Sequence, residues 1–364
     1  GRVTACLGYL ERLERGGWRG GIERADFVEL ADDLRFLRVA SRLEGKEERI
    51  AHAEEVVSFL APNLGPEGTA WDAKRRELFL SSIGKRQVFA VDREGKVSEV
   101  TAPAAEGLLA VLGMEVDAAR DLLWVATVAD REMVGYRPED DGRSELVAIS
   151  LGGSHLRSPS RGAIVRRAAA PQGTFLNDLV VSSDGTVYAT DSNGSRIFRL
   201  GPGEEAQLEG LTLPEGTLRS PNGLALADDG KALYVADFLG LVRIELATGQ
   251  AERLVTPPGF GSLGGIDGLD FFRFRGSPGF VAVQNAAGRG RVVAITLDGS
   301  GKKIQSAEVL ETGHPRFAIP TTGAVVEGAS GFEYWFLANP QAEHRPAERG
   351  GLPYTLLRLP LPKE

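Results

Sequence analysis

Cysteine, histidine and long apolar runs are what this sequence has least of. A single cysteine, Cys6, excludes an internal disulfide and a cysteine-based metal cluster. The four histidines, at positions 52, 155, 314 and 344, are scattered and lack the spacing of a zinc site. No apolar run approaches the ~20 residues that a membrane-spanning helix needs. The chain begins with Gly1 rather than Met, so the lack of a leader peptide in it is uninformative.

An excess of positive charge is also missing. The 364 residues include 50 Asp and Glu against 42 Lys and Arg, which gives a net charge of −8. This balance argues against nucleic acid or an anionic membrane as the main partner. The partner that we expect is a small-molecule substrate. The apolar share of 42% and charged share of 25% are ordinary for a globular protein with a sizeable core.

The first 50 residues differ from the rest of the chain. Apolar residues recur there at helical spacing, and Gly16-Gly17 and Gly20-Gly21 interrupt the pattern. We expect a short helical extension over 1–50. Residues 25–45 weakly resemble the end of a tetratricopeptide-type region, which would make the extension a protein contact. The interpretation that we favour is an amphipathic helical cap on the main domain, with the protein-binding module as the alternative.

Two stretches with the same anatomy, 175–192 and 220–238, show that the rest of the chain is repetitive. In each, an asparagine (Asn177, Asn222) precedes an apolar strand, an Asp-Gly turn and a second strand. The two asparagines are 45 residues apart. A unit of this length predicts an array, so we searched the whole chain for further copies.

Six copies of a strand pattern follow from residue 65 on, with no helical pattern between them. The expected second strands are 78–82, 123–127, 187–191, 233–237, 280–285 and 334–339. The expected third strands are 88–92, 146–151, 197–200, 242–246, 292–297 and 355–359. Alternation of strands with Gly/Asp turns at this period predicts an all-β fold, a six-bladed β-propeller over 54–364.

The ends of the chain predict how the ring closes. Five copies have a fourth strand, but only five residues follow Leu359 in the sixth, and two of them are prolines. The unassigned run 54–60 reads as a strand. We expect it to pair in the last blade, which closes the ring and removes an exposed edge.

One position in each copy opens the first strand, and these positions should meet at one mouth of the central channel. They are Glu67, Leu112, Asn177, Asn222, Asp267 and Thr322. Two carboxylates close together would repel unless a cation neutralised them. Carboxylate and carboxamide oxygens without Cys or His favour Ca²⁺, with Mg²⁺ or Mn²⁺ as lesser alternatives. We therefore expect Glu67, Asn177, Asn222 and Asp267 to hold a metal; each alone could equally cap a strand or turn.

Several neighbouring polar residues have a competing structural explanation. Asp178 either supports the metal ligands from behind or binds a backbone N–H at its strand start. Polar residues also end the second strands, where we expect them to cap turns at the end opposite the metal; these are Asp191, Asp237, Asn285 and Asn339.

Four of these motifs resemble a known family. PEGTAWD with Glu67, FLNDLVV with Asn177, SPNGLAL with Asn222 and GIDGLDF with Asp267 occur in order. They are similar to the senescence marker protein/gluconolactonase/luciferin-regenerating enzyme group of six-bladed, calcium-dependent propellers. Diisopropylfluorophosphatase-type enzymes belong to the same group, and paraoxonases are more distant. The resemblance covers residues 54–360. It implies that the four matching residues hold a catalytic calcium and that Asp267 also acts on the substrate.

The resemblance implies a calcium-dependent hydrolase of a lactone or a related ester or phosphotriester, with Asp267 as base or nucleophile. The alternative is a non-catalytic propeller that keeps the metal for stability and binds a ligand or protein. Loops at the mouth should supply the substrate contacts. The candidates are Phe175, Phe260 and Phe317 as apolar walls, Arg316 as an anion anchor, Thr322 in the wall and His155 in an inserted loop. A calcium site favours an extracytoplasmic location over a cytoplasmic one.

Overall fold

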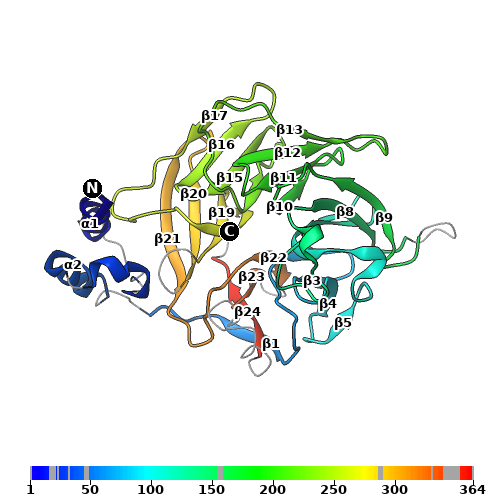
Figure 1. Cartoon of the computed structure of the whole chain (residues 1–364), viewed down its shortest axis with the longest axis horizontal. Coiled ribbons are helices and arrows are strands. Elements are labelled where there is room, and N and C mark those ends of the chain that lie inside the picture. The colour runs from blue at the N-terminus through cyan, green and yellow to red at the C-terminus, as the bar shows by residue number, and fades with distance from the viewer. Residues whose placement is uncertain are drawn as a thin grey trace.

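The chain folds as a six-bladed β-propeller, as predicted (Figure 1). The computed structural model describes residues 2–15, 22, 24–31, 33–44, 49–153, 159–285, 290–328, 331–338 and 353–362. The strands in these ranges form six antiparallel four-stranded sheets. The first three are β2 (Thr69–Asp72), β3 (Glu77–Ser82), β4 (Gln87–Asp92) and β5 (Val97–Glu99); β6 (Ala110–Asp117), β7 (Leu122–Val128), β8 (Ser144–Ser150) and β9 (Ile164–Ala169); and β10 (Leu176–Val181), β11 (Val187–Asp191), β12 (Arg196–Leu200) and β13 (Leu208–Gly210).

The other three sheets include the one that joins the two ends of the propeller. They are β14 (Leu224–Leu226), β15 (Ala232–Asp237), β16 (Gly240–Glu245) and β17 (Ala251–Arg253); β18 (Ile266–Phe274), β19 (Ser277–Gln284), β20 (Arg291–Leu297) and β21 (Ile304–Thr312); and β22 (Gly323–Gly328), β23 (Gly331–Leu337), β24 (Tyr354–Pro360) and β1 (Glu54–Phe59). Strand β1 pairs antiparallel with β24 at the outer edge of the last sheet. The beginning of the propeller therefore completes its final blade.

The first strand of each sheet lies at the centre of the molecule. Strand β2 contacts β6, β6 contacts β10, and the series continues through β14, β18 and β22 back to β2. Apolar side chains fill the space between successive blades. The clusters at the closure combine residues of blades six and one, including Leu78, Leu80, Trp335 and Tyr354. Burial of these side chains stabilises the ring at the point where its two ends meet.

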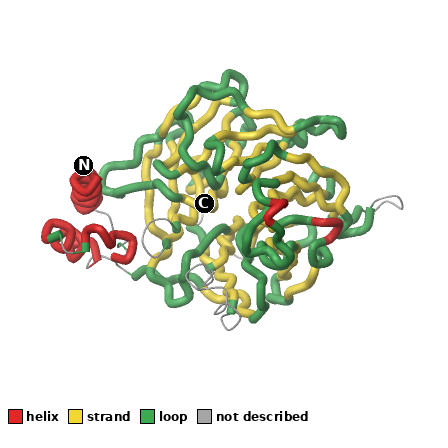
Figure 2. The backbone as a smooth tube through the Cα atoms, viewed as in Figure 1, coloured by secondary structure: helices red, strands yellow, loops and turns green. Residues whose placement is uncertain are grey.

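The N-terminal extension forms a separate helical unit beside blade five (Figures 1 and 2). It contains α1 (Arg2–Arg15), the 3₁₀ helix η1 (Arg24–Leu30) and α2 (Leu34–Glu44). These helices share a small core of their own, which includes Leu7, Leu10, Phe36 and Leu43. Residue Ile50 then bridges to Thr312 at the end of β21. Two further 3₁₀ turns lie in propeller loops, η2 (Ala105–Gly107) and η3 (Pro138–Asp140). The helices in the described ranges are too short or too polar to cross a membrane.

Candidate active site at the channel mouth

In three of the blades, a β-bulge at the start of the first strand changes the direction in which the following side chains point. The register between β6 and β7 shifts between Val111 and Met114, and equivalent shifts follow Leu176 in β10 and Ile266 in β18. Each bulge adds one residue to the inner strand, which reverses the alternation of side chains beyond it. The ring positions predicted from the sequence lie at these bulges or at the corresponding strand starts.

Glycine follows the ring position in five of the six blades, at Gly68, Gly113, Gly223, Gly268 and Gly323. A Cβ on Gly223 would lie within 3.0 Å of the carbonyl oxygen of Asp267, and one on Gly68 equally close to the carbonyl of Leu112. Only glycine permits this approach of neighbouring inner strands. Blade three has Asp178 instead, so this position carries a carboxylate in one blade only.

Asp267 is held by two carboxamides. The side-chain N–H of Asn222 donates to Oδ1 at 2.7 Å, and that of Asn285 donates to Oδ2. Burial raises the pKa of Asp267 to about 6, although the bonds from Asn285 and Asn222 oppose the rise. The carboxylate is therefore oriented at both oxygens before any ligand binds.

Glu67 lies close enough to Asp267 for the two charges to repel each other. Its backbone carbonyl accepts hydrogen bonds from the hydroxyls of Thr321 and Thr322, at 2.9 and 2.7 Å. Its Oε2 atom is buried and has no hydrogen-bond partner among the residues that the structure describes. Burial raises the pKa of Glu67 well above its ordinary value, and the charges of Asp267 and Asp178 raise it further. An orphaned carboxylate oxygen beside a second carboxylate is the environment that a cation would relieve.

Asn177 completes the set of four predicted ligands. Its side-chain N–H donates to Ser192 Oγ at 3.1 Å, and Ser192 donates in turn to the carbonyl of Pro221 at 2.7 Å. This chain of bonds uses the amide nitrogen of Asn177, so its carbonyl oxygen is available to a ligand. It also links blade three to the loop before Asn222.

Asp178 behaves as a strand-start residue and as part of the channel. Its Oδ1 accepts from the N–H of Leu179 at 2.9 Å, and its Oδ2 accepts from the N–H of Leu224 at 3.3 Å. Burial raises its pKa to about 7 despite these two bonds. It therefore joins the inner strands of blades three and four, near the strand starts that carry Asn177 and Asn222.

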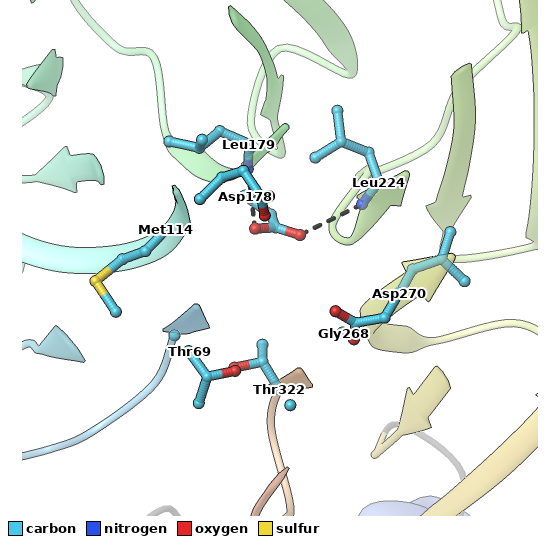
Figure 3. A pocket seen from close by; sticks show the side chains of 12 residues that line it. Thr69, Met114, Asp178, Leu179, Leu224, Gly268, Asp270 and Thr322 are labelled. Carbon is cyan, nitrogen blue, oxygen red and sulfur yellow. Dashed lines mark hydrogen bonds between the residues drawn. The ribbon is translucent and has the colours of Figure 1, made fainter. Parts of the chain in front are cut away.

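Two carboxylates that the sequence analysis did not use lie deeper in the channel. Glu115 and Asp270 line a cavity of about 30 Å³ together with Asp178, Thr69 and Thr322. Figure 3 shows the carboxylates of Asp178 and Asp270 pointing into the same space, with the two threonine hydroxyls nearby. This volume holds one or two water molecules.

Both deeper carboxyl groups strongly favour the protonated form. Burial raises the pKa of Glu115 to about 8, and the charges of Asp270 and Asp178 contribute. Burial likewise raises the pKa of Asp270 to about 8, although it accepts a hydrogen bond of 2.8 Å from the Tyr334 hydroxyl. They occupy the third position after the ring residue in blades two and five. Both carboxylates are visible in the sequence motifs LGMEVD and DGLDFF. Their direction towards the channel, however, depends on the bulge in each strand.

The residues that end the second strands were placed at the wrong end of the blades. Leu176 pairs with Asp191, and the N–H of Asn222 donates to the carbonyl of Ala236, next to Asp237. An antiparallel second strand must end where the first begins, so these residues lie at the same mouth as the predicted metal ligands. Asn285 accordingly reaches Asp267 and belongs to the site.

The turn-capping role of the two aspartates is confirmed. Asp191 accepts from the N–H groups of Phe175 and Gly194 and pairs with Arg196 at 2.8 Å. Asp237 accepts from the N–H groups of Arg219 and Leu239 and pairs with Arg253. The fourth residue of this group, Asn339, lies outside the described residues, as does His155.

The predicted substrate contacts fall into two groups. Thr322 lines the channel cavity, and Phe175 packs beside the ring residue Leu112. Phe260 lies under the guanidinium of Arg291, 4.7 Å from it. The other two lie in the loop before β22: Phe317 packs against Phe336, and Arg316 pairs with Glu55 of β1 at 3.0 Å. That ion pair ties Arg316 to the outer strand of blade six.

The residues at the mouth fit an oxygen-coordinated cation. Two carboxylates and two carboxamides supply hard oxygen donors, which suit calcium, and the orphaned Oε2 of Glu67 is one of them. Among the described residues, no three His, Cys, Asp or Glu side chains gather in a metal-binding arrangement. The set at the mouth contains only two such residues, Glu67 and Asp267, so it depends on its asparagines.

Known structures share the propeller fold at low sequence identity. A gluconolactonase from Xanthomonas campestris is 17% identical with a TM-score of 0.55, and the match covers 86% of this chain and 91% of that one. The Mala s 1 allergen of Malassezia sympodialis is 13% identical with a TM-score of 0.60, covering 83% and 95%. A Thermus thermophilus protein described as a glucose dehydrogenase-type oxidoreductase is 18% identical with a TM-score of 0.54, covering 84% and 99%.

Comparison of the sequence with protein families is more specific than the likeness of folds. No curated protein matched the sequence. Residues 65–244, however, match the family described as the SMP-30/Gluconolactonase/LRE-like region. The matched segment contains Glu67, Asn177 and Asn222, three of the four predicted metal ligands. Over residues 65–244 the chain therefore belongs to the SMP-30/Gluconolactonase/LRE-like family.

Proposed function

We propose that the protein is a calcium-dependent hydrolase of a lactone or of a related ester or phosphotriester. The observation that carries the proposal is the pair formed by Asp267, oriented by two carboxamides, and the orphaned carboxylate oxygen of Glu67 beside it. The family match and the gluconolactonase among the structural neighbours support a lactonase-like hydrolase. Neighbours described as lyases and dehydrogenases share the fold, so the residues of the site rather than the fold support the reaction.

Each residue has a role that its surroundings support. Glu67, Asn177, Asn222 and Asp267 would hold the calcium. When bound, the cation would supply electrophilic polarisation of a carbonyl or phosphoryl oxygen. Asp267 would use one carboxylate oxygen to take a proton from water or to attack the substrate directly.

The hydrogen bonds to Asp267 define how it could act. Asn222 and Asn285 each bind one of its oxygens, which limits rotation of the carboxylate and favours a fixed direction of attack. With its pKa raised to about 6, Asp267 is a stronger base than an exposed aspartate and is still largely ionised at neutral pH.

The test is a hydrolysis screen over lactones, esters and phosphotriesters, run with calcium and with a chelator. We expect turnover that the chelator abolishes and calcium restores. Asp267→Asn should lower kcat by about 10²–10⁴, the usual contribution of a general base. Asp228→Asn, an exposed aspartate of the same protein, is the matched control and should retain wild-type kcat.

Two results would separate this proposal from its alternative. Activity that resists the chelator would remove the metal from the mechanism. A complete absence of turnover, with calcium still raising the melting temperature, would identify a metal-stabilised binding propeller instead.

A further inference from the structure

A second cavity lies between blades one and two, apart from the central channel. Its volume is about 420 Å³, and four arginines line it, Arg86, Arg137, Arg143 and Arg167. Three carboxylates, Glu106, Asp140 and Glu145, line it as well, so the arginines exceed them by one. These side chains come from the β3–β4 turn, the β7–β8 loop and strand β9. The turn and the loop are joined by a hydrogen bond from the N–H of Val134 to the carbonyl of Gly84.

The cavity opens on the same side of the propeller as the channel mouth. Strand β3 ends at Ser82, beside Gly68 of the inner strand, and Arg86 follows four residues later. Leu109 lines the cavity and packs in one apolar cluster with the ring residue Leu112 and with Phe175. This apolar cluster thus lies between the two sites.

Three of the four arginines share carboxylates. Arg137 and Arg143 both bind Asp140, and Arg143 and Arg167 both bind Glu145. Arg137 also lies 3.7 Å from Glu139, which is mostly exposed. Each shared carboxylate leaves guanidinium N–H groups available, because an arginine has five donors.

Arg86 binds backbone carbonyls rather than a carboxylate in the described part of the chain. Its Nε donates to the carbonyl of Leu108 at 2.6 Å, and one terminal nitrogen donates to that of Val134 at 3.3 Å. Burial lowers the pKa of Arg86, and the neighbouring Arg137 and Arg143 lower it further, against the opposing effect of Asp140. Several guanidinium groups therefore converge on one hollow, and a partly buried arginine there is not neutralised by a carboxylate of its own.

We propose that this cavity is a binding site for a small molecule that carries a carboxylate or phosphate group. Arg86 would supply the uncompensated positive charge, and Arg137 at the rim would close around the anion. Planar guanidinium groups match the oxygens of both kinds of anion in a bidentate manner. The site does not depend on the proposed hydrolase activity.

Another cavity, also of about 420 Å³, provides an internal control for this second cavity. It lies between blades two and three at the other ends of the strands and has two arginines, Arg120 and Arg166, with Asp117 and Glu204. Arg120 pairs with Asp117 at 3.0 Å and Arg166 lies over the ring of Trp124. Its charges balance, so it should not attract an anion.

The test is titration calorimetry of the calcium-free protein, prepared on a chelating resin, with inorganic phosphate and with succinate at constant ionic strength. We expect saturable binding of at least one anion. Arg86→Gln should weaken it at least tenfold and Arg137→Gln at least fivefold, while Arg120→Gln changes it less than twofold. The two anions reveal which chemistry the site prefers.

Three outcomes would overturn the proposal: no saturable binding of either anion, equal weakening by Arg120→Gln, or retained binding in Arg137→Gln. Because Arg86 also supports two loops through backbone carbonyls, the rim variant keeps the test decisive if Arg86→Gln loses its fold. The readout is binding rather than turnover, so failure here would leave the proposed hydrolase untouched.

Discussion

The mouth and the interior of the channel are lined by the same inner strands, yet their carboxylates differ in chemistry. At the mouth, Asp267 accepts hydrogen bonds from two carboxamides, and the pKa of Asp267 rises only to about 6. Three residues further along the same strand, Asp270 accepts one bond from Tyr334, and burial raises the pKa of Asp270 to about 8. Burial is the main cause of both shifts. Asp267 has two donors, whereas Asp270 has one donor and also faces the charge of Asp178, so Asp267 is the group that stays ionised.

This difference suggests that the two parts of the channel have different functions. The mouth combines an ionised carboxylate with amide oxygens and the orphaned oxygen of Glu67, which suits a cation. The interior carboxyls have few donors and a cavity for only one or two waters, which suits retention of protons. Each prediction below would break or sharpen that contrast.

The largest expected effect is on calcium affinity. Glu67→Gln removes the charge of a predicted ligand and should weaken calcium binding about 100-fold, or ~2.7 kcal/mol. Glu115→Gln, the matched change in the interior, should alter it less than threefold. Calorimetric titration of both variants measures this. Equal losses in the two variants would place the cation deeper in the channel than we propose.

The next effect concerns the glycines that bring the inner strands together at the mouth. Gly223→Ala places a Cβ against the carbonyl of Asp267, so β14 and β18 must separate there. We expect a loss of about 2 kcal/mol in the free energy of unfolding, as for an overpacked core. Gly203→Ala is the control, because a Cβ there meets no atom within 4 Å. Urea unfolding of the two variants would show whether the contact is as tight as described.

The ring of mouth residues could be predicted from the sequence, but the interior could not. A 45-residue repeat brings Asn177, Asn222 and Asp267 to equivalent places, whatever the details of each blade. Glu115 was not predicted, because regular alternation of side chains puts it on the strand face opposite the ring residue. The bulge reverses that alternation and turns Glu115 towards the channel. Asn285 was not predicted as a site residue, because the end of its strand was expected at the side of the propeller opposite the mouth.

Local pattern thus predicts strands, turns and repeats well, whereas side-chain direction depends on single inserted residues. The sequence also contains the arginines of the second cavity without any regular spacing. They come from one turn, one loop and one outer strand of two blades, which only the closed ring brings together.

The interior carboxyls predict a distinctive dependence of stability on pH. Their pKa values of about 8 in the folded protein exceed the ordinary value near 4, so the folded state binds more protons between these limits. The stabilisation is full at low pH and is lost as the pH rises towards 8. Each group contributes a slope of about −1.4 kcal/mol per pH unit in this window.

Urea unfolding of the calcium-free protein at several pH values between 5 and 9 measures that slope. Asp270→Asn and Glu115→Gln should each flatten it, whereas Glu99→Gln, on the exposed edge of β5, should not. An unchanged slope in both channel variants would mean that the interior groups are already ionised in the folded protein, and the contrast with the mouth would disappear.

The smallest effect should come from Asn285, whose side-chain hydrogen bond within the described residues is the one to Asp267. Removing its amide in Asn285→Ala leaves the bond from Asn222 to Oδ1 in place, so the carboxylate keeps one of its two supports. We expect kcat to fall about fivefold, ~1 kcal/mol, with calcium affinity and the unfolding free energy nearly unchanged. A purely structural residue would instead lower stability and leave kcat intact. Partial recovery of kcat in Asn285→Gln, which retains the amide donor, would distinguish an orienting bond to Asp267 from simple filling of space.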